Sequence, residues 1–375
     1  MTIKKLVNIF HKTKNPKRKK RILWLFNHTP LREFEVPMLE ELGFEVYCCK
    51  RLPGKDTVIG KTDSYSSVYD FDKKLTISKD NINKLDKFNF YDQDFNSEIK
   101  EIINENFGIV FFPIYEKTIV NVLKYCTGEL FLHVFGREYN LNYSNLVKYY
   151  LRKDYSSVMS KVSDRFYFAP AYEQIIPNED EDFQKISKYL PIGMSENSLT
   201  NSDTWVGGAN KIMFVCPRIE TNADVYYRII YDKFKENLGD FDYEVAGGQF
   251  NKFDDKKILG FLSDDDYKKR FLTSSVMFYH SQEKRHVHYH PLEAIVYGMP
   301  LIFMAGGILT DSRGKGLPGE CKNYDEARLK LKRILDGDKL FTNEVISSQK
   351  TILKRYSKEY CVGYWKVNFL AQLEN

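Results

Sequence analysis

Residues 280–303 read HSQEKRHVHYHPLEAIVYGMPLIF, and this stretch decides the fold. It predicts the end of a strand, a loop rich in histidine and cations, a helix, a turn and a second strand. Pro291 favours the first turn of a helix, and Gly298 favours its end. The apolar run from Leu301 to Phe303 then predicts a buried strand. This order of elements is typical of an α/β fold with a parallel sheet.

The start of this predicted helix offers a place for an anion. Amide groups at a helix N-terminus and cations in the preceding loop both attract negative charge. We expect Glu293 to lie in the first turn, where its carboxylate would suit hydroxyl groups beside a phosphate. The pattern therefore indicates a nucleotide or a nucleotide sugar as the ligand.

Working outward, the same alternation of strands and helices occurs twice along the chain. An apolar run at 22–26 opens the first series, and a second run at 211–216 restarts the pattern after a polar stretch that reads as a linker. Two such halves predict two doubly wound α/β domains, with ligands in the cleft between them. The expected parts are a basic tail at 1–21, a Rossmann-like domain at 22–195, a second one at 206–341, and a helical segment at 342–375.

Composition limits the class of protein. Hydrophobic residues make up 43% of the 375 residues, which is ample for two cores, and no apolar stretch is long enough to span a membrane. Six cysteines without a CxxC pair indicate buried free thiols in a reducing compartment, so we expect a cytoplasmic protein. The net charge of +5 comes from the N-terminal run, which is a solvated tail or a contact for anionic lipid at the inner membrane face. Nucleic acid is not an expected partner.

From residue 211 onward, the order of elements resembles the donor domain of GT-B glycosyltransferases. The resemblance covers about 140 residues and is carried by Arg218 after a strand, Gly247-Gly248, GFLSDDDYKKRF and PLEAIVYGMPLIF. It implies a GT-B fold with a nucleotide-sugar donor, and a C-terminal helix that packs back on the N-terminal domain. It also implies no cofactor and no metal, although the alternating His286, His288 and His290 leave a zinc site as an alternative.

Part of the pattern differs from that family. Many members carry a second glutamate eight residues before the one at 293, and here that position is Arg285. HPLE and the segment HTPLREFEVPMLEELGFEVY also resemble bacterial surface-polysaccharide transferases, including β-Kdo transferases that use CMP-Kdo. An acidic donor sugar would explain a cation at 285, because a carboxylate ligand calls for one.

The resemblance and the positions at predicted strand ends select candidate residues for the donor. Each has a simpler alternative: helix capping, a surface ion pair, a solvated loop or an ordinary tight turn. The candidates for donor binding are Arg218, Gly247, Gly248, Arg285, His288, His290 and Glu293.

In the first domain, two strand ends carry charged side chains that could face the cleft. Carboxylates there could act as a general base or a nucleophile, although exposed helix charges are an equal explanation. Candidates for the acceptor side are His28, Arg32 and Arg137. Candidates for the catalytic carboxylate are Glu138 first, then Asp224 and Glu35.

The sequence therefore predicts a glycosyltransferase that moves a sugar from a nucleotide donor to a cell-surface glycan or glycolipid, such as lipopolysaccharide O-antigen or capsule. Two rival functions stay open. One is a sugar-nucleotide epimerase of similar fold, which would need no acceptor. The other is a non-catalytic protein that binds nucleotide or glycan.

Overall fold

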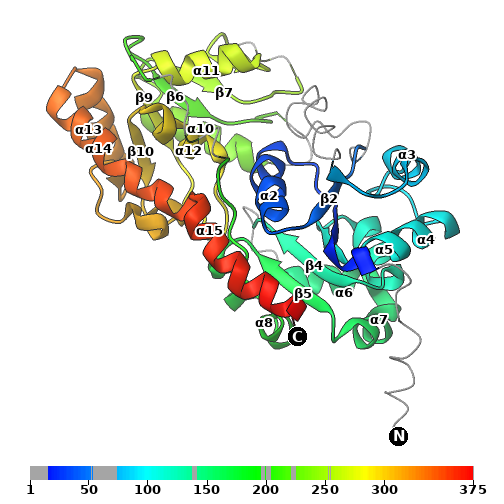
Figure 1. Cartoon of the computed structure of the whole chain (residues 1–375). Helices are drawn as coiled ribbons and strands as arrows, with labels where there is room; N and C mark the ends of the chain where they lie inside the picture. The colour runs from blue at the N-terminus through cyan, green and yellow to red at the C-terminus, as the bar shows by residue number, and fades with distance from the viewer. Residues whose placement is uncertain are drawn as a thin grey trace, which may run out of the picture. The chain divides into compact units, whose positions relative to one another are not determined.

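The computed structural model describes residues 16–51, 53, 74–136, 142–195, 199, 204–220, 225–251, 253 and 255–374. The chain forms two compact units. The first comprises Met1–Met194 together with Cys361–Asn375, and the second comprises Ser195–Tyr360. Each unit contains one parallel sheet with helices (Figure 1).

The sheet of the first unit has five strands in the order β2-β1-β3-β4-β5, all parallel. Their side chains are almost all buried, as expected for a parallel sheet covered on both faces. The order reverses between β1 and β3, where Ile22 pairs with both Val46 and Ile109. The strands are β1 (Arg21–Trp24), β2 (Glu45–Cys48), β3 (Ile109–Phe112), β4 (Glu129–Val134) and β5 (Phe166–Pro170).

Helices of the first unit begin where the sequence supplies a cap. Ser78, Asn96, Asn142 and Asp180 each accept a hydrogen bond from a backbone N–H in the first turn. The helices are α2 (Thr29–Glu41), α3 (Lys79–Lys87), α4 (Ser97–Asn106), α5 (Glu116–Tyr125), α6 (Tyr143–Leu151), α7 (Tyr155–Val162) and α8 (Glu181–Lys185). Short 3-10 turns are η1 (Pro16–Lys20), η3 (Arg152–Asp154) and η4 (Glu173–Asn178).

The end of the predicted basic tail belongs to the folded unit, which corrects its assignment as solvated chain. Arg18 is buried, and its guanidinium donates to Phe107 O at 2.8 Å and to Thr127 Oγ1 at 2.6 Å. Arg21 is the first residue of β1 and forms an ion pair with Glu45 at 2.9 Å. Residues 1–15, which carry the rest of the predicted membrane contact, lie outside the described residues.

The sheet of the second unit has six parallel strands in the order β11-β10-β9-β6-β7-β8. The order reverses between β6 and β9, so the carboxyl ends of these two neighbours flank the crevice where doubly wound sheets bind ligands. The strands are β6 (Ile212–Val215), β7 (Tyr243–Ala246), β8 (Ile258–Gly260), β9 (Val276–Tyr279), β10 (Leu301–Met304) and β11 (Glu320–Cys321).

One helix of the second unit starts earlier than predicted. The helix α12 begins at Tyr289, with His288 as its N-cap in an extended conformation, so Glu293 lies beyond the first turn. Pro291 still falls within the first turn, where a missing N–H costs nothing. The helices and helical turns are α10 (Tyr226–Leu238), α11 (Asp264–Thr273), α12 (Tyr289–Tyr297), η5 (Thr310–Gly314), α13 (Tyr324–Leu335), α14 (Lys339–Gln349) and η6 (Lys350–Tyr356).

The C-terminal segment is not the single helix that the sequence predicts. The chain leaves helical geometry at Ser357, continues as α15 (Lys358–Trp365), η7 (Lys366–Leu370) and α16 (Ala371–Glu374), and groups with the first unit from Cys361 onward. There the Trp365 indole N–H donates to Pro191 O at 2.9 Å. The Phe369 ring lies 5.3 Å from that of Phe111. These aromatic contacts attach the last helices to the first sheet.

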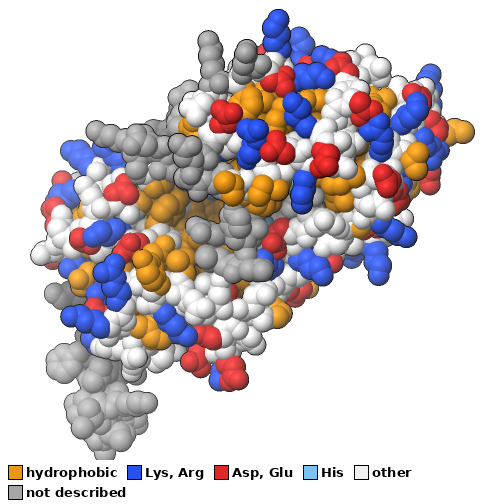
Figure 2. Space-filling model, turned by 180° about the vertical axis from the view of Figure 1, so that it is seen from behind, with side chains coloured by type: hydrophobic (Ala, Val, Ile, Leu, Met, Phe, Trp, Pro, Cys, Tyr) orange, Lys and Arg blue, Asp and Glu red, His pale blue; other side chains and the backbone are white. Residues whose placement is uncertain are grey.

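The six cysteines are all free and buried, which confirms the predicted thiols. Within the described part of the chain, no helix is both long enough and apolar enough to cross a bilayer. On the face drawn in Figure 2, Lys and Arg side chains lie among Asp and Glu side chains rather than in one patch of a single charge.

Candidate functional site

Arg218 stands directly beyond β6, at the point where the strand order of the second sheet reverses. Its backbone has φ of 55°, the left-handed region that costs a side-chain-bearing residue about 1–2 kcal/mol. Its N–H donates to Gly248 O at 3.0 Å, and its guanidinium carbon lies 5.7 Å from the centre of the Phe250 ring. Strain held at a strand end is a frequent mark of a functional position.

A buried glutamine fixes the backbone on both sides of Arg218. Gln249 Oε1 accepts from the N–H of Ile219 at 2.9 Å, and its amide donates to Cys216 O at 2.8 Å. The loops after β6 and β7 are thereby joined into one rigid edge. No sequence motif predicts this role of Gln249, because a glutamine after two glycines resembles an ordinary loop residue.

Gly247 is required by the backbone of this edge, whereas Gly248 lies against an exposed aromatic ring. Gly247 has φ of 111°, and a Cβ there would lie 2.9 Å from the backbone nitrogen of Pro217. A Cβ on Gly248 would lie 2.5 Å from the Phe261 ring. The contact with Pro217 explains why position 247 needs a glycine, and the approach of a nucleotide to Gly247 and Gly248 stays a prediction.

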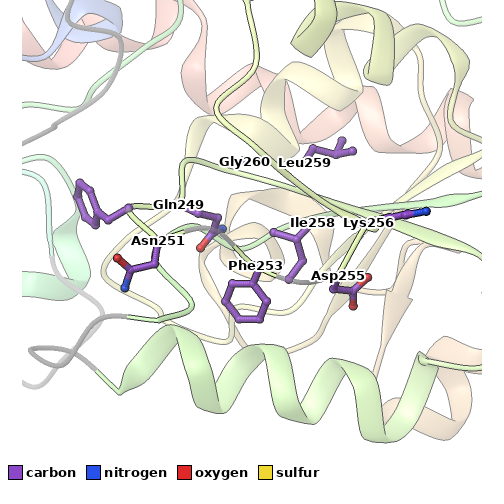
Figure 3. A pocket seen from close by; sticks show the side chains of 9 residues that line it. Gln249, Asn251, Phe253, Asp255, Lys256, Ile258, Leu259 and Gly260 are labelled. Carbon is purple, nitrogen blue, oxygen red and sulfur yellow. The ribbon is translucent and has the colours of Figure 1, made fainter.

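Beside this edge, the second unit has an open hollow of about 420 Å³. Figure 3 shows its lining, which comes from the loop after β7 and from β8. The ring of Phe250, which lines the hollow, is 47% exposed, and the ring of Phe261, directly after β8, is 62% exposed. Exposed aromatic faces next to a cation are suited to stacking against a planar ring.

Four histidines gather between the end of β9 and the start of α12. Neighbouring rings lie 4.9 Å apart for His286 and His288 and 5.2 Å apart for His288 and His290. The hydroxyl of Tyr279 lies 3.3 Å from Nδ1 of His288. His280 adds a ring 5.8 Å from that of Tyr279. His288 and His290 are among the residues predicted from the sequence, whereas His280 is not, although its place directly after a strand was a usable signal.

Burial keeps two of these rings uncharged. Desolvation, with the nearby His288 as a smaller cause, lowers the pKa of His280 from 6.5 to about 3. Burial also lowers the pKa of His290 well below its ordinary value, and His288, His280 and His286 add to this effect. Both ring nitrogens of His280 are buried and lack a hydrogen-bond partner among the described residues.

We expect these histidines to make the protein less stable in acid. Below pH 6.5 the unfolded chain takes up a proton at His280, whereas the folded protein does not until pH falls to about 3. The free energy of unfolding should therefore fall by up to about 1.4 kcal/mol per pH unit for this residue as pH drops below 6.5. Urea unfolding at several pH values should give a shallower slope for His280→Gln, and an unchanged slope would contradict this assignment.

Arg285 is held in an ion pair, which corrects the reason for expecting an acidic sugar. Its Nε donates to Glu283 Oε1 at 2.8 Å and its Nη2 to Glu283 Oε2 at 3.0 Å, and both side chains are largely buried. This two-point contact shapes the loop before α12 and gives Arg285 a carboxylate partner within the chain itself.

Glu293 lies on α12 and is partly exposed. Its charge acts on the hydroxyl of Tyr267 in α11, whose pKa is raised mainly by burial and further by Glu293 and Tyr297. The carboxylate is therefore close to α11.

In the first unit, Glu35 is completely buried, which corrects its predicted catalytic role. Its Oε2 accepts from the indole N–H of Trp24 at 2.8 Å, and its Oε1 lies 2.9 Å from Nε2 of His133. Nδ1 of His133 lies 2.6 Å from Ala169 O, a group that can only accept, so Nδ1 carries a proton. Both oxygens are thus engaged in a network that joins α2 to β1 and β4.

Arg32 is also part of the packed interior rather than an acceptor contact. It is 3% exposed, donates to Phe26 O at 3.1 Å and lies over the Trp24 ring at 5.6 Å. His28 is the N-cap residue of α2 and is partly exposed at the end of β1. His133 is not among the residues predicted from the sequence, although a histidine within the apolar run LFLHVF indicated a buried polar contact.

Three predicted residues cannot be placed. Arg137, Glu138 and Asp224 lie outside the described residues. Within the described ranges, no group of three or more His, Cys, Asp or Glu side chains is arranged to hold a metal ion.

Solved structures resemble this arrangement over nearly the whole chain. A glycosyltransferase from Rickettsia africae ESF-5 has 12% identity and a TM-score of 0.57, with 95% of this chain and 99% of that chain covered. The Anabaena protein HepE in complex with UDP-glucose has 11% identity and a TM-score of 0.55, with 94% and 99% covered. Sucrose-phosphate synthase from Thermosynechococcus elongatus has 10% identity and a TM-score of 0.51, with the same coverage.

The chain has the GT-B fold. This confirms the predicted fold class of two Rossmann-like α/β parts, each with its own parallel sheet. No protein-family model matches the sequence, and no curated protein resembles it significantly. At identities of 10–12%, the likeness to solved structures concerns the course of the backbone and not the choice of substrate.

Proposed function

We propose that this protein is a glycosyltransferase that uses a nucleotide-sugar donor bound by its second unit. The observation that carries the proposal is the crevice edge between β6 and β9. There the sheet order, a strained arginine and the start of α12 coincide, and the exposed ring of Phe250 lies beside that arginine. The fold supports the same function, since HepE, which shares it, was solved with UDP-glucose.

The proposed roles follow from what each group can contact. Arg218 and His290 would hold the donor phosphates, because a guanidinium and a ring at a helix start are suited to an anion. Phe250 and Phe261 would stack against the base, and Glu293 would accept from ribose hydroxyls. Cations and helix amides at the departing phosphate would stabilise the charge that develops as the sugar leaves.

The first unit would bind the acceptor, which we propose to be a glycan or glycolipid of the cell surface. His28 and Arg137 are the acceptor-side residues that stay in the proposal. Glu138 is the first candidate for the catalytic carboxylate and Asp224 the second. The reaction would need no cofactor or metal, and the basic residues before Pro16 would bring the protein to an anionic membrane surface.

The identity of the nucleotide and the sugar in the donor is a separate question. CMP-Kdo is a candidate because of the HPLE segment, whereas the ion pair of Arg285 with Glu283 removes one argument for an acidic sugar. The UDP-glucose bound to HepE, a protein of the same fold, favours a UDP donor. We therefore expect a UDP-sugar, with CMP-Kdo as the alternative.

A ligand screen by thermal unfolding tests the donor site. UDP, GDP, dTDP, ADP and CMP are compared at equal concentration, and we expect UDP to stabilise the protein. A ligand at about 100 times its Kd adds roughly 2.7 kcal/mol, enough to raise Tm by several degrees. Stabilisation by CMP alone would select the acidic sugar, and no stabilisation by any nucleotide would contradict the proposed donor site.

Activity assays separate the rival functions. Release of nucleotide that depends on an added glycan acceptor supports a transferase. Conversion of a UDP-sugar without an acceptor would identify an epimerase instead. Nucleotide binding with no turnover of any sugar nucleotide would leave a binding protein.

A further inference from the structure

The left-handed backbone at Arg218 has to be maintained by neighbouring groups, because a residue with a Cβ is disfavoured in that region. Its φ is 55°. Its own N–H donates to Gly248 O at 3.0 Å, and the N–H of the next residue, Ile219, donates to the side chain of Gln249 at 2.9 Å. Strained residues persist where surrounding contacts over-determine the backbone, and these contacts come from the loop after β7.

Gln249 forms three hydrogen bonds at this edge through one buried side chain. It is 8% exposed. Its Oε1 accepts from the N–H of Ile219, and its Nε2 donates to Cys216 O at 2.8 Å and to Gly247 O at 3.1 Å. Ile219 and Cys216 lie on either side of Arg218 in the sequence, so one amide group bridges the strained residue. The bridge needs a group that donates and accepts at the same time.

The same glutamine lies at the proposed donor site. It lines the hollow of about 420 Å³ beside β8 (Figure 3). The next residue is Phe250, whose ring centre lies 5.7 Å from the guanidinium carbon of Arg218. Gln249 is therefore joined directly to two groups that the proposed function assigns to the donor. The chain joins it to the aromatic ring, and hydrogen bonds join it to the backbone around the arginine.

A second buried glutamine with the same bonding pattern lies away from this edge. Gln349 is 2% exposed, accepts from the N–H of Leu301 at 2.9 Å and donates to Met299 O at 2.8 Å. It joins α14 to the amino end of β10, whereas ligands of doubly wound sheets bind at the carboxyl ends. None of the described residues 299–301 is in the left-handed region. Gln349 therefore represents the structural role of such a bridge without a strained residue inside it.

We propose that Gln249 is a positioning residue for the donor, and that its side chain holds Arg218 where the guanidinium can bind the donor phosphates. This inference rests on the proposed function, because it takes Arg218 as a phosphate contact. Gln249 then raises the affinity for phosphates that it does not touch, since a cation held in place loses less freedom on binding. Its contribution must disappear when the Arg218 side chain is absent.

A double-mutant cycle on the full chain tests this dependence. Gln249→Met removes the hydrogen bonds but keeps a side chain of similar length. Isothermal titration calorimetry measures the Kd of UDP and of inorganic pyrophosphate. We expect Gln249→Met to raise both Kd values about tenfold in the otherwise unchanged protein, which is within the range of coupled neighbours. In the Arg218→Gly background, the same change should alter them by less than about twofold.

Two controls separate positioning from general damage to the fold. Uridine has no phosphate, so its Kd should be the same with and without Gln249→Met as long as the hollow is intact. Gln349→Met removes the matched bridge and should lower Tm by an amount similar to Gln249→Met, while the Kd of UDP and of pyrophosphate stays unchanged. Gln249→Asn, whose side chain is one methylene shorter and cannot reach both sides of Arg218, replaces Gln249→Met if that variant does not fold.

The outcomes distinguish this inference from the proposed function. Equal Kd changes in both backgrounds, no change at all, or an equal loss for uridine would overturn the inference and leave the donor site standing. Coupling with pyrophosphate while UDP does not bind supports the inference and contradicts a UDP donor. Coupling without acceptor-dependent release of nucleotide supports the inference and contradicts the transferase. Binding of neither UDP nor pyrophosphate overturns both the inference and the proposed donor site.

Discussion

Replacing Glu35 with alanine should destabilise the first unit by about 3–5 kcal/mol, because it removes the carboxylate partner of a buried histidine and a buried indole. Glu35 is 0% exposed, and its two oxygens contact Trp24 and His133. The truncation leaves two polar groups without partners in a site that water does not reach. Urea unfolding followed by fluorescence measures the loss.

Two further variants separate structure from catalysis. Glu33→Ala removes a carboxylate from the exposed face of the same helix and should change stability by less than about 0.5 kcal/mol. Glu35→Gln can still accept from Trp24 through its oxygen and donate to Nε2 of His133 through its amide. We expect it to be far milder than alanine and to retain transferase activity. Loss of activity in a stable Glu35→Gln protein would restore Glu35 as a catalytic candidate.

Replacing Arg218 with glycine should lower kcat/KM about a hundredfold while the fold is kept. The loss of one charged contact to the donor phosphates corresponds to about 2.7 kcal/mol or more of transition-state stabilisation. Stability should stay the same or rise by up to about 1 kcal/mol. The left-handed backbone at φ of 55° costs arginine about 1–2 kcal/mol, and the greater freedom of glycine in the unfolded chain offsets part of that relief.

Arg152 provides a matched control for this experiment. It is also an arginine at positive φ, 51°, but it lies in the first unit and is 72% exposed. Arg152→Gly should change stability by a similar small amount and leave kcat/KM unchanged. Equal activity losses in both glycine variants would mean that backbone change, not the lost guanidinium, is responsible.

Much of each sheet could be predicted from short apolar runs. Runs such as ILWLF, IVFF and KIMFV became strands of a parallel sheet because a strand covered on both faces must be apolar at every position. N-terminal helix caps could also be predicted from the sequence. Ser263, for example, accepts a hydrogen bond from the N–H of Asp266 at the start of α11. These features depend on residues within a few positions of one another.

The candidate site was predictable in part. Arg218 and the histidines were singled out because they follow predicted strands, and the structure places them at the carboxyl ends of β6 and β9. The burial of the Glu35 side chain was not predicted, because a charged side chain suggests exposure to solvent. Its spacing of four from Leu31 and from Leu39 already placed it on the buried stripe of α2. The pairing of Arg285 with Glu283 was equally close in the sequence and was overlooked.

What the amino-acid sequence alone determined was the class of fold, the two series of strands and helices, and the residues at the ends of the strands. The order of strands within each sheet came only from the folded structure, because pairing between β6 and β9 joins residues more than sixty positions apart and depends on how all helices pack. That pairing brings Arg218 and the four histidines near the start of α12 to one edge. Burial then lowers the pKa of His280 and His290, because the rest of the unit excludes water and this penalises the charged imidazole.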